Sequence, residues 1–370
     1  MLLVFTVILV ALIFTYTNGF HDTANSIATV VGTKVLTPRQ AILLATFTNL
    51  LGAMVGGAVA ATIAAGLVDS SLIPTNASSH MLICALVSAI VWNLVTWYFG
   101  LPSSSSHALV GGLCGAAFAA AQNNLNAVIW MKPPGPGEHW WSGGGVVFKV
   151  VLPMIISPIL GLIIAFILMA ALYFLLHSWK PRTVTRIFGK AQLISSAYMG
   201  FSHGTNDAQK TMGIIALALI AATKAGTFDH LPHWLHFLRT PEGADPEHLK
   251  IALWIKILCA LTMAAGTAMG GWRIIRTLGH KLVKLQAVHG FAAETAGATV
   301  LLVTAALGMP VSTTHVITSA IMGVGAAKRL NALKWSVAER IVWAWILTLP
   351  VSAGLAYAIV RLARLFGAEV

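Results

Sequence analysis

The chain contains ten long apolar segments, and a polypeptide with so many of them cannot hide its nonpolar surface inside a soluble domain. Each segment approaches or exceeds the roughly 20 residues that a helix needs to cross a bilayer. Of the 370 residues, 57% are hydrophobic and only 9% are charged. The sequence therefore predicts an all-α integral membrane protein that spans the lipid bilayer many times. The apolar segments are residues 1–33, 40–66, 81–99, 101–122, 146–176, 190–222, 250–272, 287–307, 309–327 and 335–360.

Two of these segments, 1–33 and 190–222, are too long for one simple crossing and contain polar residues. We expect each of them to be broken or kinked near its middle, because an interrupted apolar helix usually bends where its backbone pairing is disturbed. The expected architecture is a helical bundle with broken or re-entrant helices.

The positive charge is concentrated in four short connections between apolar segments. Such loops are retained on the cytoplasmic side of a membrane, so ten crossings place both termini outside the cytoplasm. This distribution also explains the net charge of +12 without nucleic-acid binding, which is not predicted. The basic residues of these connections are Lys34, Arg39, Lys180, Arg182, Arg186, Lys190, Arg273, Arg276, Lys281, Lys284, Lys328, Arg329 and Lys334.

Two motifs recur in the same order in the two halves of the chain. The polar stretch at 18–25 returns at 200–207, and the stretch at 100–107 returns at 308–315. Five crossings in each half force the second half to run inverted through the membrane, which is the organisation of many secondary transporters. The predicted units are a first inverted repeat at 1–176, a cytoplasmic connecting loop at 177–190 and a second inverted repeat at 191–370.

Three carboxylates are expected at membrane depth: Asp22, Asp207 and Glu294. An ionisable group is costly there, so each is a candidate ion ligand or proton carrier. A structural carboxylate, neutralised by a nearby base or capping a broken helix, is the alternative. Asp22 and Asp207 occupy equivalent places in the two halves. The predicted residues for a coupling cation or proton are these two acids, Glu294 and the amides Asn25 and Asn206.

The second motif joins a proline to a run of hydroxyl residues. Pro102 and Pro310 are expected to end the preceding helix, and Ser/Thr runs are typical of a helix N-terminus. Such an end presents unpaired backbone N–H groups and a positive dipole, which suit a tetrahedral oxyanion. Alternatively, these small residues pack and hydrogen-bond between helices. The candidate anion-binding residues are Ser104, Ser105, Ser106, Ser312, Thr313 and Thr314.

Several basic side chains adjoin the motifs. Histidines precede the acidic motifs and follow the hydroxyl runs. Each of them is either a packing group or has a direct role as a ligand or proton relay. A lysine three residues after Asp207 lies on the same helical face; alternatively, it snorkels to an interface. The candidates to modulate ion binding are His21, Lys210, His107 and His315.

These motifs resemble those of the inorganic phosphate transporter (PiT) family. The matching stretches are 21–25, 203–207, 100–107, 308–315 and 290–294. The resemblance covers nearly the whole chain. It implies a symporter of inorganic phosphate that works by alternating access, driven by sodium in some members and by protons in others, with metal–phosphate complexes as substrate in some bacterial ones.

Two departures from the family pattern bear on the coupling ion. His21 and Lys210 stand where the pattern has amides, and the first-half acid that some members carry near 47–49 is missing. A fixed lysine charge competes with a mobile sodium ion for Asp207, which leaves Asp22 as the group that takes up and releases a proton. The sequence therefore predicts proton-coupled phosphate symport, with sodium-coupled symport as the alternative.

Two other functions fit the same residues less well than phosphate symport. A passive anion channel would use the same helix ends to line a pore, but buried carboxylates beside an anion path need a cation to neutralise them. A membrane-embedded hydrolase lacks a nucleophile–base pair. We therefore expect no enzyme activity, no metal site and no cofactor beyond the coupling ion, H⁺ or Na⁺. The expected location is a bacterial inner membrane, and assembly into a homo-oligomer is left open.

Overall fold

The computed structural model of the chain describes residues 1–74, 77–229, 232–240 and 251–367. Almost all of these residues lie in helices, so the predicted all-α fold is confirmed. Residue 250, the predicted start of one apolar segment, lies outside the described residues. The main helices are α1 Leu2–Gly32, α2 Pro38–Ala53, α3 Ala58–Ala65, α4 Ser78–Phe99, α5 Ser105–Ala120, α6 Leu152–Leu175, α7 Pro181–Lys224, α8 Leu253–Met269, α9 Trp272–Arg276, α10 Ala287–Ala306, α11 Thr313–Lys328 and α12 Trp335–Leu365.

Fewer helices are long and apolar enough to cross a membrane than the sequence suggested. Five of the described helices pass this test, or seven when each of two sharply bent pairs counts as one span. The segments predicted at 101–122 and 309–327 contain only α5 and α11, of 16 residues each. A helix of that length covers about 24 Å, less than the roughly 30 Å of the hydrocarbon core. The prediction of a separate crossing for each of these segments is wrong.

The helix breaks lie elsewhere than predicted. α1 and α7 are continuous over 31 and 44 residues, because their polar side chains find partners across the bundle and the helical backbone needs no interruption. The bends instead separate α2 from α3, by 70°, and α8 from the helical residues that begin with α9, by 58°. Gly56 and Gly270 have φ values of +90° and +73° at these bends, which residues with a Cβ rarely adopt.

The predicted connecting loop at 177–190 is also shorter than expected. α6 ends at Leu175 and α7 already begins at Pro181. Proline is suited to the first turn of a helix because the N–H it lacks has no intrahelical partner there. The basic residues at 182, 186 and 190 therefore lie on the first turns of α7 rather than in a loop.

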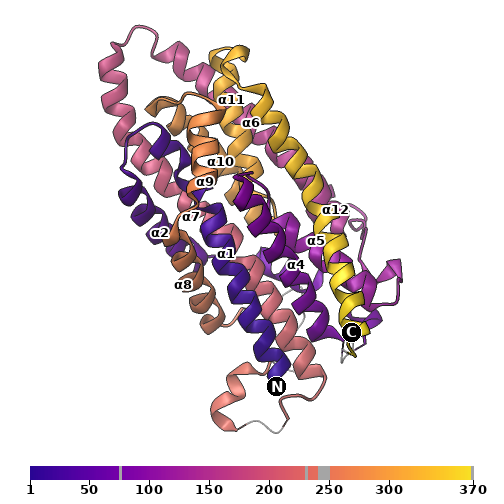
Figure 1. The fold of residues 1–370 in the computed structure, drawn as a ribbon. Coiled ribbons are helices and arrows are strands. Elements are labelled where there is room, and N and C mark those ends of the chain that lie inside the picture. The colour runs from indigo at the N-terminus through magenta and orange to yellow at the C-terminus, as the bar shows by residue number, and fades with distance from the viewer. Residues whose placement is uncertain (75–76, 230–231, 241–250, 368–370) are drawn as a thin grey trace.

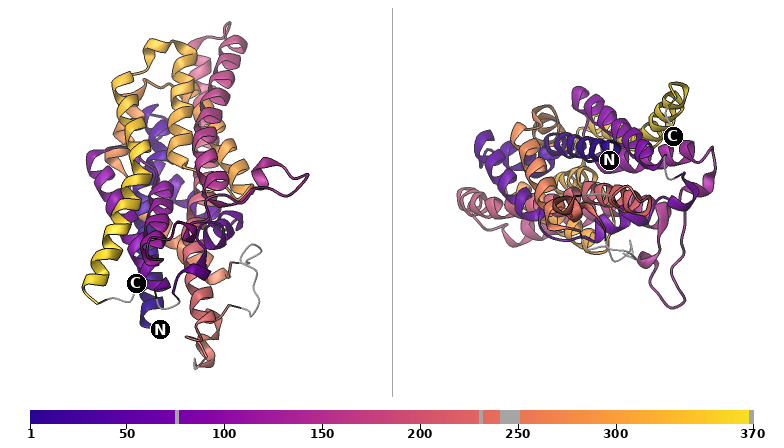
Figure 2. Two further views of the ribbon diagram at one scale, coloured as in Figure 1. Left: turned by 90° about the vertical axis from the view of Figure 1, so that its right-hand side faces the viewer. Right: turned by 90° about the horizontal axis from the view of Figure 1, so that it is seen from below.

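The bundle is elongated, with both chain termini at the same end (Figure 1, Figure 2). The connection from α6 to α7 and the connection from α11 to α12 lie at the opposite end (Figure 1). Both of these connections belong to the predicted basic loops. The termini are thus separated from this basic end by the length of the bundle, as the predicted topology requires.

The helices pack in corresponding pairs. α1 packs against α4, α8 and α9, and α7 packs against α10, α2 and α3. The short helix α5 lies on α4 and α12, and α11 lies on α10 and α6. Two related halves would produce this correspondence, although the boundaries of the repeats stay a prediction.

Two apolar cores lie toward the two ends of the bundle. One core combines the first half of α1 with the second half of α7, and the other combines the second half of α1 with the first half of α7. Between them, α1 and α7 carry a stretch of buried polar residues. This polar layer contains the predicted acidic motifs.

Candidate substrate and cation site

One face of α1 and one face of α7 line the polar layer. Asn18, Asp22 and Asn25 follow one another at spacings of four and three residues on α1, which places them on one side of the helix. On α7, His203 precedes Asp207 by four residues, so these two side chains also lie on one side of their helix. All of these side chains are at most 2% exposed, so each charge must find its partners inside the protein.

The hydroxyl runs form helix N-termini, as predicted. The Ser104 hydroxyl accepts a hydrogen bond from the His107 backbone N–H at 3.1 Å, and α5 begins at the next residue. The Ser312 hydroxyl accepts from the His315 N–H at 3.2 Å in the same way at the start of α11. These N-caps leave the other N–H groups of each first turn free of intrahelical partners.

The two helix ends meet at the centre of the bundle. The Ser106 hydroxyl donates to the Val311 carbonyl at 3.2 Å. The rings of His107 and His315 contact each other edge to face, with 4.8 Å between their centroids. Two runs that are about 200 residues apart in the chain therefore form one continuous polar surface.

The first acidic motif binds both hydroxyl runs. The Ser105 hydroxyl donates to Asp22 Oδ2 at 2.5 Å, and Asn18 Oδ1 lies 2.7 Å from the same hydroxyl. The Thr314 hydroxyl donates to Asp22 Oδ1 at 3.3 Å. The Asp22 carboxylate thus connects α5 to α11.

The second acidic motif and Asn25 complete this network. The Thr313 hydroxyl donates to Asp207 Oδ2 at 3.3 Å. The Asn25 amide donates to the hydroxyls of Thr313 and Thr314 at 3.1 and 2.9 Å. Three of the predicted cation-binding residues, Asp22, Asn25 and Asp207, therefore lie in one network with Ser105, Thr313 and Thr314 of the predicted anion-binding residues.

A basic side chain pairs with each carboxylate. Asp22 Oδ1 lies 2.6 Å from His21 Nδ1. Asp207 Oδ1 forms an ion pair with Lys210, whose ammonium group also donates to the Ser106 hydroxyl and to the Val311 carbonyl. Lys210 is fully buried, so the alternative that it snorkels to an interface is wrong.

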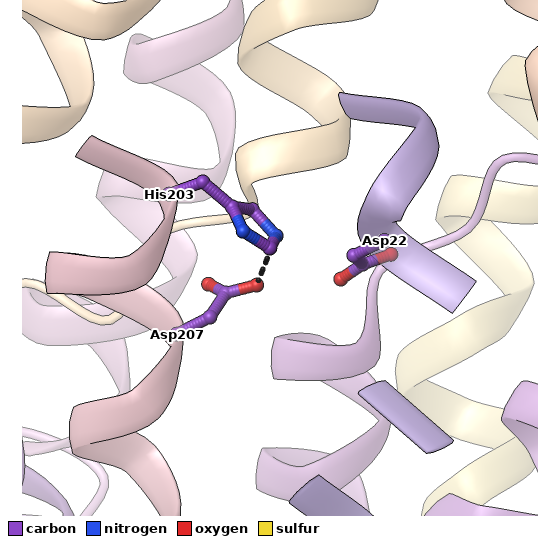
Figure 3. A group of neighbouring side chains, drawn as sticks. All are labelled: Asp22, His203 and Asp207. Atoms are coloured by element: carbon purple, nitrogen blue, oxygen red, sulfur yellow. Dashed lines mark ion pairs between the residues drawn. The ribbon is translucent and has the colours of Figure 1, made fainter. Parts of the chain in front are cut away.

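His203 brings the two acidic motifs into one group. Its Nε2 lies 3.2 Å from Asp207 Oδ2, and one ligand atom from each of Asp22, His203 and Asp207 lies within 4.8 Å of the others. Figure 3 shows the three side chains facing one another between α1 and α7. This group could hold a metal ion, although the sequence analysis predicted no metal site.

Some polar atoms of this region have no hydrogen-bond partner among the described residues. They include the Asn25 oxygen, both side-chain polar atoms of Asn206 and both ring nitrogens of His107. Buried polar groups are normally hydrogen-bonded. These atoms are therefore available to a bound ligand, which makes Asn206 and His107 candidates to contact it.

Glu294 lies in a separate polar cluster. Its carboxylate accepts hydrogen bonds from Thr29 at 2.5 Å, from Gln192 at 3.1 Å and from Ser195. Thr29 is one helical turn beyond Asn25 on α1, toward the basic end. The structure thus does not bring Glu294 together with the other predicted cation ligands.

Asn18 was not among the predicted site residues, and His203 was predicted only as a histidine that is a packing group, a ligand or a proton relay. Asn18 lies one turn before Asp22, and His203 lies one turn before Asp207. The i,i+4 spacing on a continuous helix was the signal that could have identified both. The predicted break in each segment hid this spacing, because a broken helix does not keep residues on one face.

Comparison with known proteins gives a consistent result. Residues 18–356 match the Phosphate transporter family. A "Probable low-affinity inorganic phosphate transporter" of Bacillus subtilis (strain 168) is 39% identical over 96% of this chain and 96% of the relative. A protein with the same description from Rhizobium meliloti (strain 1021) is 39% identical over 94% of this chain and 92% of the relative. A solved structure, "The sodium-dependent phosphate transporter", superposes with a TM-score of 0.80 at 25% identity, covering 99% of this chain and 100% of the other.

Proposed function

The chain belongs to the phosphate transporter family, and from this premise we propose that it is a symporter that carries inorganic phosphate together with a cation by alternating access. It is an integral membrane transporter and not an enzyme.

Phosphate would bind between the two hydroxyl runs. The helix N-termini at Ser105 and Thr313 face one site and supply backbone N–H groups and hydroxyl donors. Such ends attract anions because their N–H groups and dipoles point at the ligand. Lys210 adds a fixed positive charge that touches Ser106 and the carbonyl of Val311.

The balance of charges in the site is the observation that supports coupling of phosphate to a cation. The site holds two buried carboxylates, Asp22 and Asp207, and one lysine, Lys210. An additional phosphate anion would leave a net negative charge in a region where uncompensated charge is very costly. Phosphate entry therefore requires a cation or protons at the same time, which an open anion channel would not need.

We propose protons as the coupling ions. Nitrogen groups already surround both carboxylates: His21 beside Asp22, with His203 and Lys210 beside Asp207. Sodium prefers oxygen ligands, whereas histidine exchanges protons in the physiological range. His21 and Asp22 would then form the pair that takes up the proton.

Sodium coupling is the second candidate. The solved structure with the same fold is titled a sodium-dependent phosphate transporter. Oxygen atoms of Asp22, Asn25 and Asp207 would be the ligands. A sodium ion here would have to displace Lys210 or His203 from Asp207, or bind beside them.

A metal–phosphate complex is a further form of the substrate that the site could accept. The group formed by Asp22, His203 and Asp207 offers one nitrogen and two carboxylates within 4.8 Å. Imidazole and carboxylate together suit a divalent transition ion. The metal would be cargo, released with phosphate.

Glu294 would act on the path between this site and the basic end of the bundle. It is fully buried, and the Thr29 hydroxyl links its carboxylate to α1. An acid in such a position suits a relay that receives a cation or proton after it leaves Asp22.

The transporter would sit in a bacterial plasma membrane with both termini outside. The basic connections at 177–180 and 329–334 lie at the end of the bundle opposite the termini (Figure 1), and basic loops are retained in the cytoplasm. Labelling of single cysteines placed at 178 and at 136 from either side of the membrane would test this orientation.

Uptake of phosphate into proteoliposomes tests the function directly. Sodium-free vesicles under an inward proton gradient are expected to accumulate phosphate above the external concentration. Accumulation only under a sodium gradient would identify sodium, and not the proton, as the coupling ion. Downhill flux that ignores both gradients would instead indicate a channel. Acceleration by Mg²⁺ or Zn²⁺, with equal uptake of the metal, would identify the complex as substrate.

A further inference from the structure

An apolar groove crosses the surface of the bundle between α4 and α12. It has a volume of 340 Å³, and Trp92, Val95, Phe99, Trp343 and Leu347 form most of its wall. Arg340 lies at the edge of this groove. The groove therefore combines a mostly nonpolar wall with one positively charged side chain.

A cationic pocket continues this groove. A second pocket, of 410 Å³, is lined by Phe99, Arg273, Arg276 and Lys281. A small pocket of 50 Å³ between the two shares Phe99 and Lys281 with the cationic pocket and Arg340 with the groove. The three form one surface, which has a nonpolar part and a basic part.

The four cationic side chains of this surface have no carboxylate partner within the described part of the chain. The Arg273 guanidinium donates to the Tyr98 carbonyl at 2.5 Å and lies 5.0 Å from the centre of the Trp97 ring. Arg340 donates to the Ser336 carbonyl at 3.3 Å. Their positive charges are thus available to an anion.

Exposed aromatic residues surround the junction of the two parts. Tyr98, Phe99, Trp272 and Trp343 are 44 to 68% exposed. Aromatic rings of this kind collect where the lipid headgroups meet the hydrocarbon core. These rings are therefore suited to headgroup depth, which would place the groove on the side of the hydrocarbon.

We infer that this surface binds an anionic phospholipid, with its phosphate on Arg273, Arg276, Lys281 and Arg340 and one acyl chain in the groove between α4 and α12. Basic pockets between membrane helices are known to take acidic headgroups. A zwitterionic lipid would fill the groove, but it has no net negative charge to balance the four cations. A free anion would pair with the cations but leave the groove unused.

The lipid would contact the connection that carries the first hydroxyl run. The Thr277 hydroxyl donates to the Gly100 carbonyl at 2.9 Å, and Trp345 Nε1 donates to the Pro102 carbonyl at 3.0 Å. Residues on both sides of the proposed lipid-binding surface thus hydrogen-bond to the backbone that leads into Ser104. A bound headgroup would stabilise this connection.

Native mass spectrometry of the purified full-length chain tests the inference without any transport assay. The protein is expected to retain phosphatidylglycerol at least fivefold better than phosphatidylcholine. Arg276→Gln with Lys281→Gln should reduce the retained phosphatidylglycerol at least fivefold. The matched control, Arg182→Gln with Arg186→Gln, removes two exposed charges at the same end of the bundle and should change retention less than twofold. Equal losses in both double variants would overturn the inference.

A second variant separates the lipid from other occupants. Leu347→Trp fills the groove and leaves the cations intact, so phosphatidylglycerol should be lost while the protein keeps its thermal unfolding midpoint in detergent. Retention of the lipid in this variant would overturn the inference. Displacement of the lipid by millimolar inorganic phosphate would assign the cations to free phosphate instead. Loss of a dimer in the same variant, with no dependence on lipid, would assign the groove to a second copy of the chain.

Discussion

Lys210 on α7 donates a hydrogen bond to the Ser106 hydroxyl at the start of α5, while it also pairs with Asp207 one turn earlier on its own helix. A side chain from the second half of the chain therefore holds the hydroxyl run of the first half. Its ammonium group also reaches the Val311 carbonyl, 3.2 Å away, just before the second run. Lys210 thus contacts the first run, the backbone just before the second run and one acidic motif.

Lys210→Met is expected to lower the stability of the folded protein by about 3 kcal/mol or more, because it leaves the buried Asp207 carboxylate without its ion pair. Thermal unfolding in detergent measures the change. The double variant Lys210→Met with Asp207→Asn removes the unpaired charge and should recover most of the lost stability. If the double variant is no more stable than the single one, the pair has no such role.

Ser105→Ala with Thr313→Ala should weaken phosphate binding at least tenfold. Each hydroxyl contributes about 1 kcal/mol when buried, and these two belong to different runs. Equilibrium binding of radiolabelled phosphate to the purified protein measures the effect. Ser157→Ala is the matched control, since Ser157 is buried on α6 and its hydroxyl has no partner among the described residues. Unchanged binding in a folded double variant would remove the hydroxyl runs from the phosphate site.

Asp22→Asn and Asp207→Asn should each abolish gradient-driven uptake by the protein that inserts and folds; Asp207→Asn also lowers stability, because it leaves the buried Lys210 without its ion pair. Both changes keep the size of the side chain and remove the charge that balances the coupling ion. The control is Asp229→Asn, whose ion pair with Arg239 is exposed and contributes little to stability. Normal accumulation of phosphate by either site variant would show that its carboxylate takes no part in coupling.

His21→Asn with Lys210→Asn places amides where the family pattern has them. With the His21 imidazole removed from Asp22 and the Lys210 ammonium removed from Asp207, uptake is expected to lose its dependence on the proton gradient and to gain a stimulation by sodium of at least several-fold. Counterflow in vesicles with each gradient imposed alone measures the change. Retained proton dependence in this variant would exclude His21 and Lys210 from the choice of ion.

Gly204→Ala should disrupt the contact of α7 with α2. A Cβ added at Gly204 would lie 2.2 Å from the Asn49 carbonyl oxygen, and this backbone atom cannot move away without shifting α2. The expected result is a lower unfolding temperature and weaker transport, because His203 is the adjacent residue. Gly57→Ala is the control, since nothing lies within 4 Å of its added Cβ. Equal behaviour of both variants would show that the helices adapt to the extra carbon.

The helical class and the hydroxyl-run helix starts were predictable from local signals. Apolar length, a proline and a Ser/Thr run act within a few residues, and Ser104 and Ser312 indeed cap α5 and α11. Phosphate as the substrate followed from the motif resemblance, which the family match confirms.

The helix breaks and the partners of the charged groups were not predictable in the same way. Whether a polar stretch interrupts a helix depends on what faces it, and Asn25 finds Thr313 almost 290 residues away. Lys210 could have reached an interface equally well on sequence grounds. Only the packing of α7 against the two hydroxyl runs decides that it is buried.

The unbroken course of α7 has a mechanical consequence. At 44 residues the helix is about 66 Å long, and His203 and Asp207 lie near its midpoint. If a rigid helix of this length tilts by about 5° around its centre, its two ends move by about 3 Å in opposite directions, because each end lies half of the helix length from the centre. In the proposed alternating access, such a tilt would open one end of the bundle and close the other in the same movement, while His203 and Asp207 would stay nearly in place.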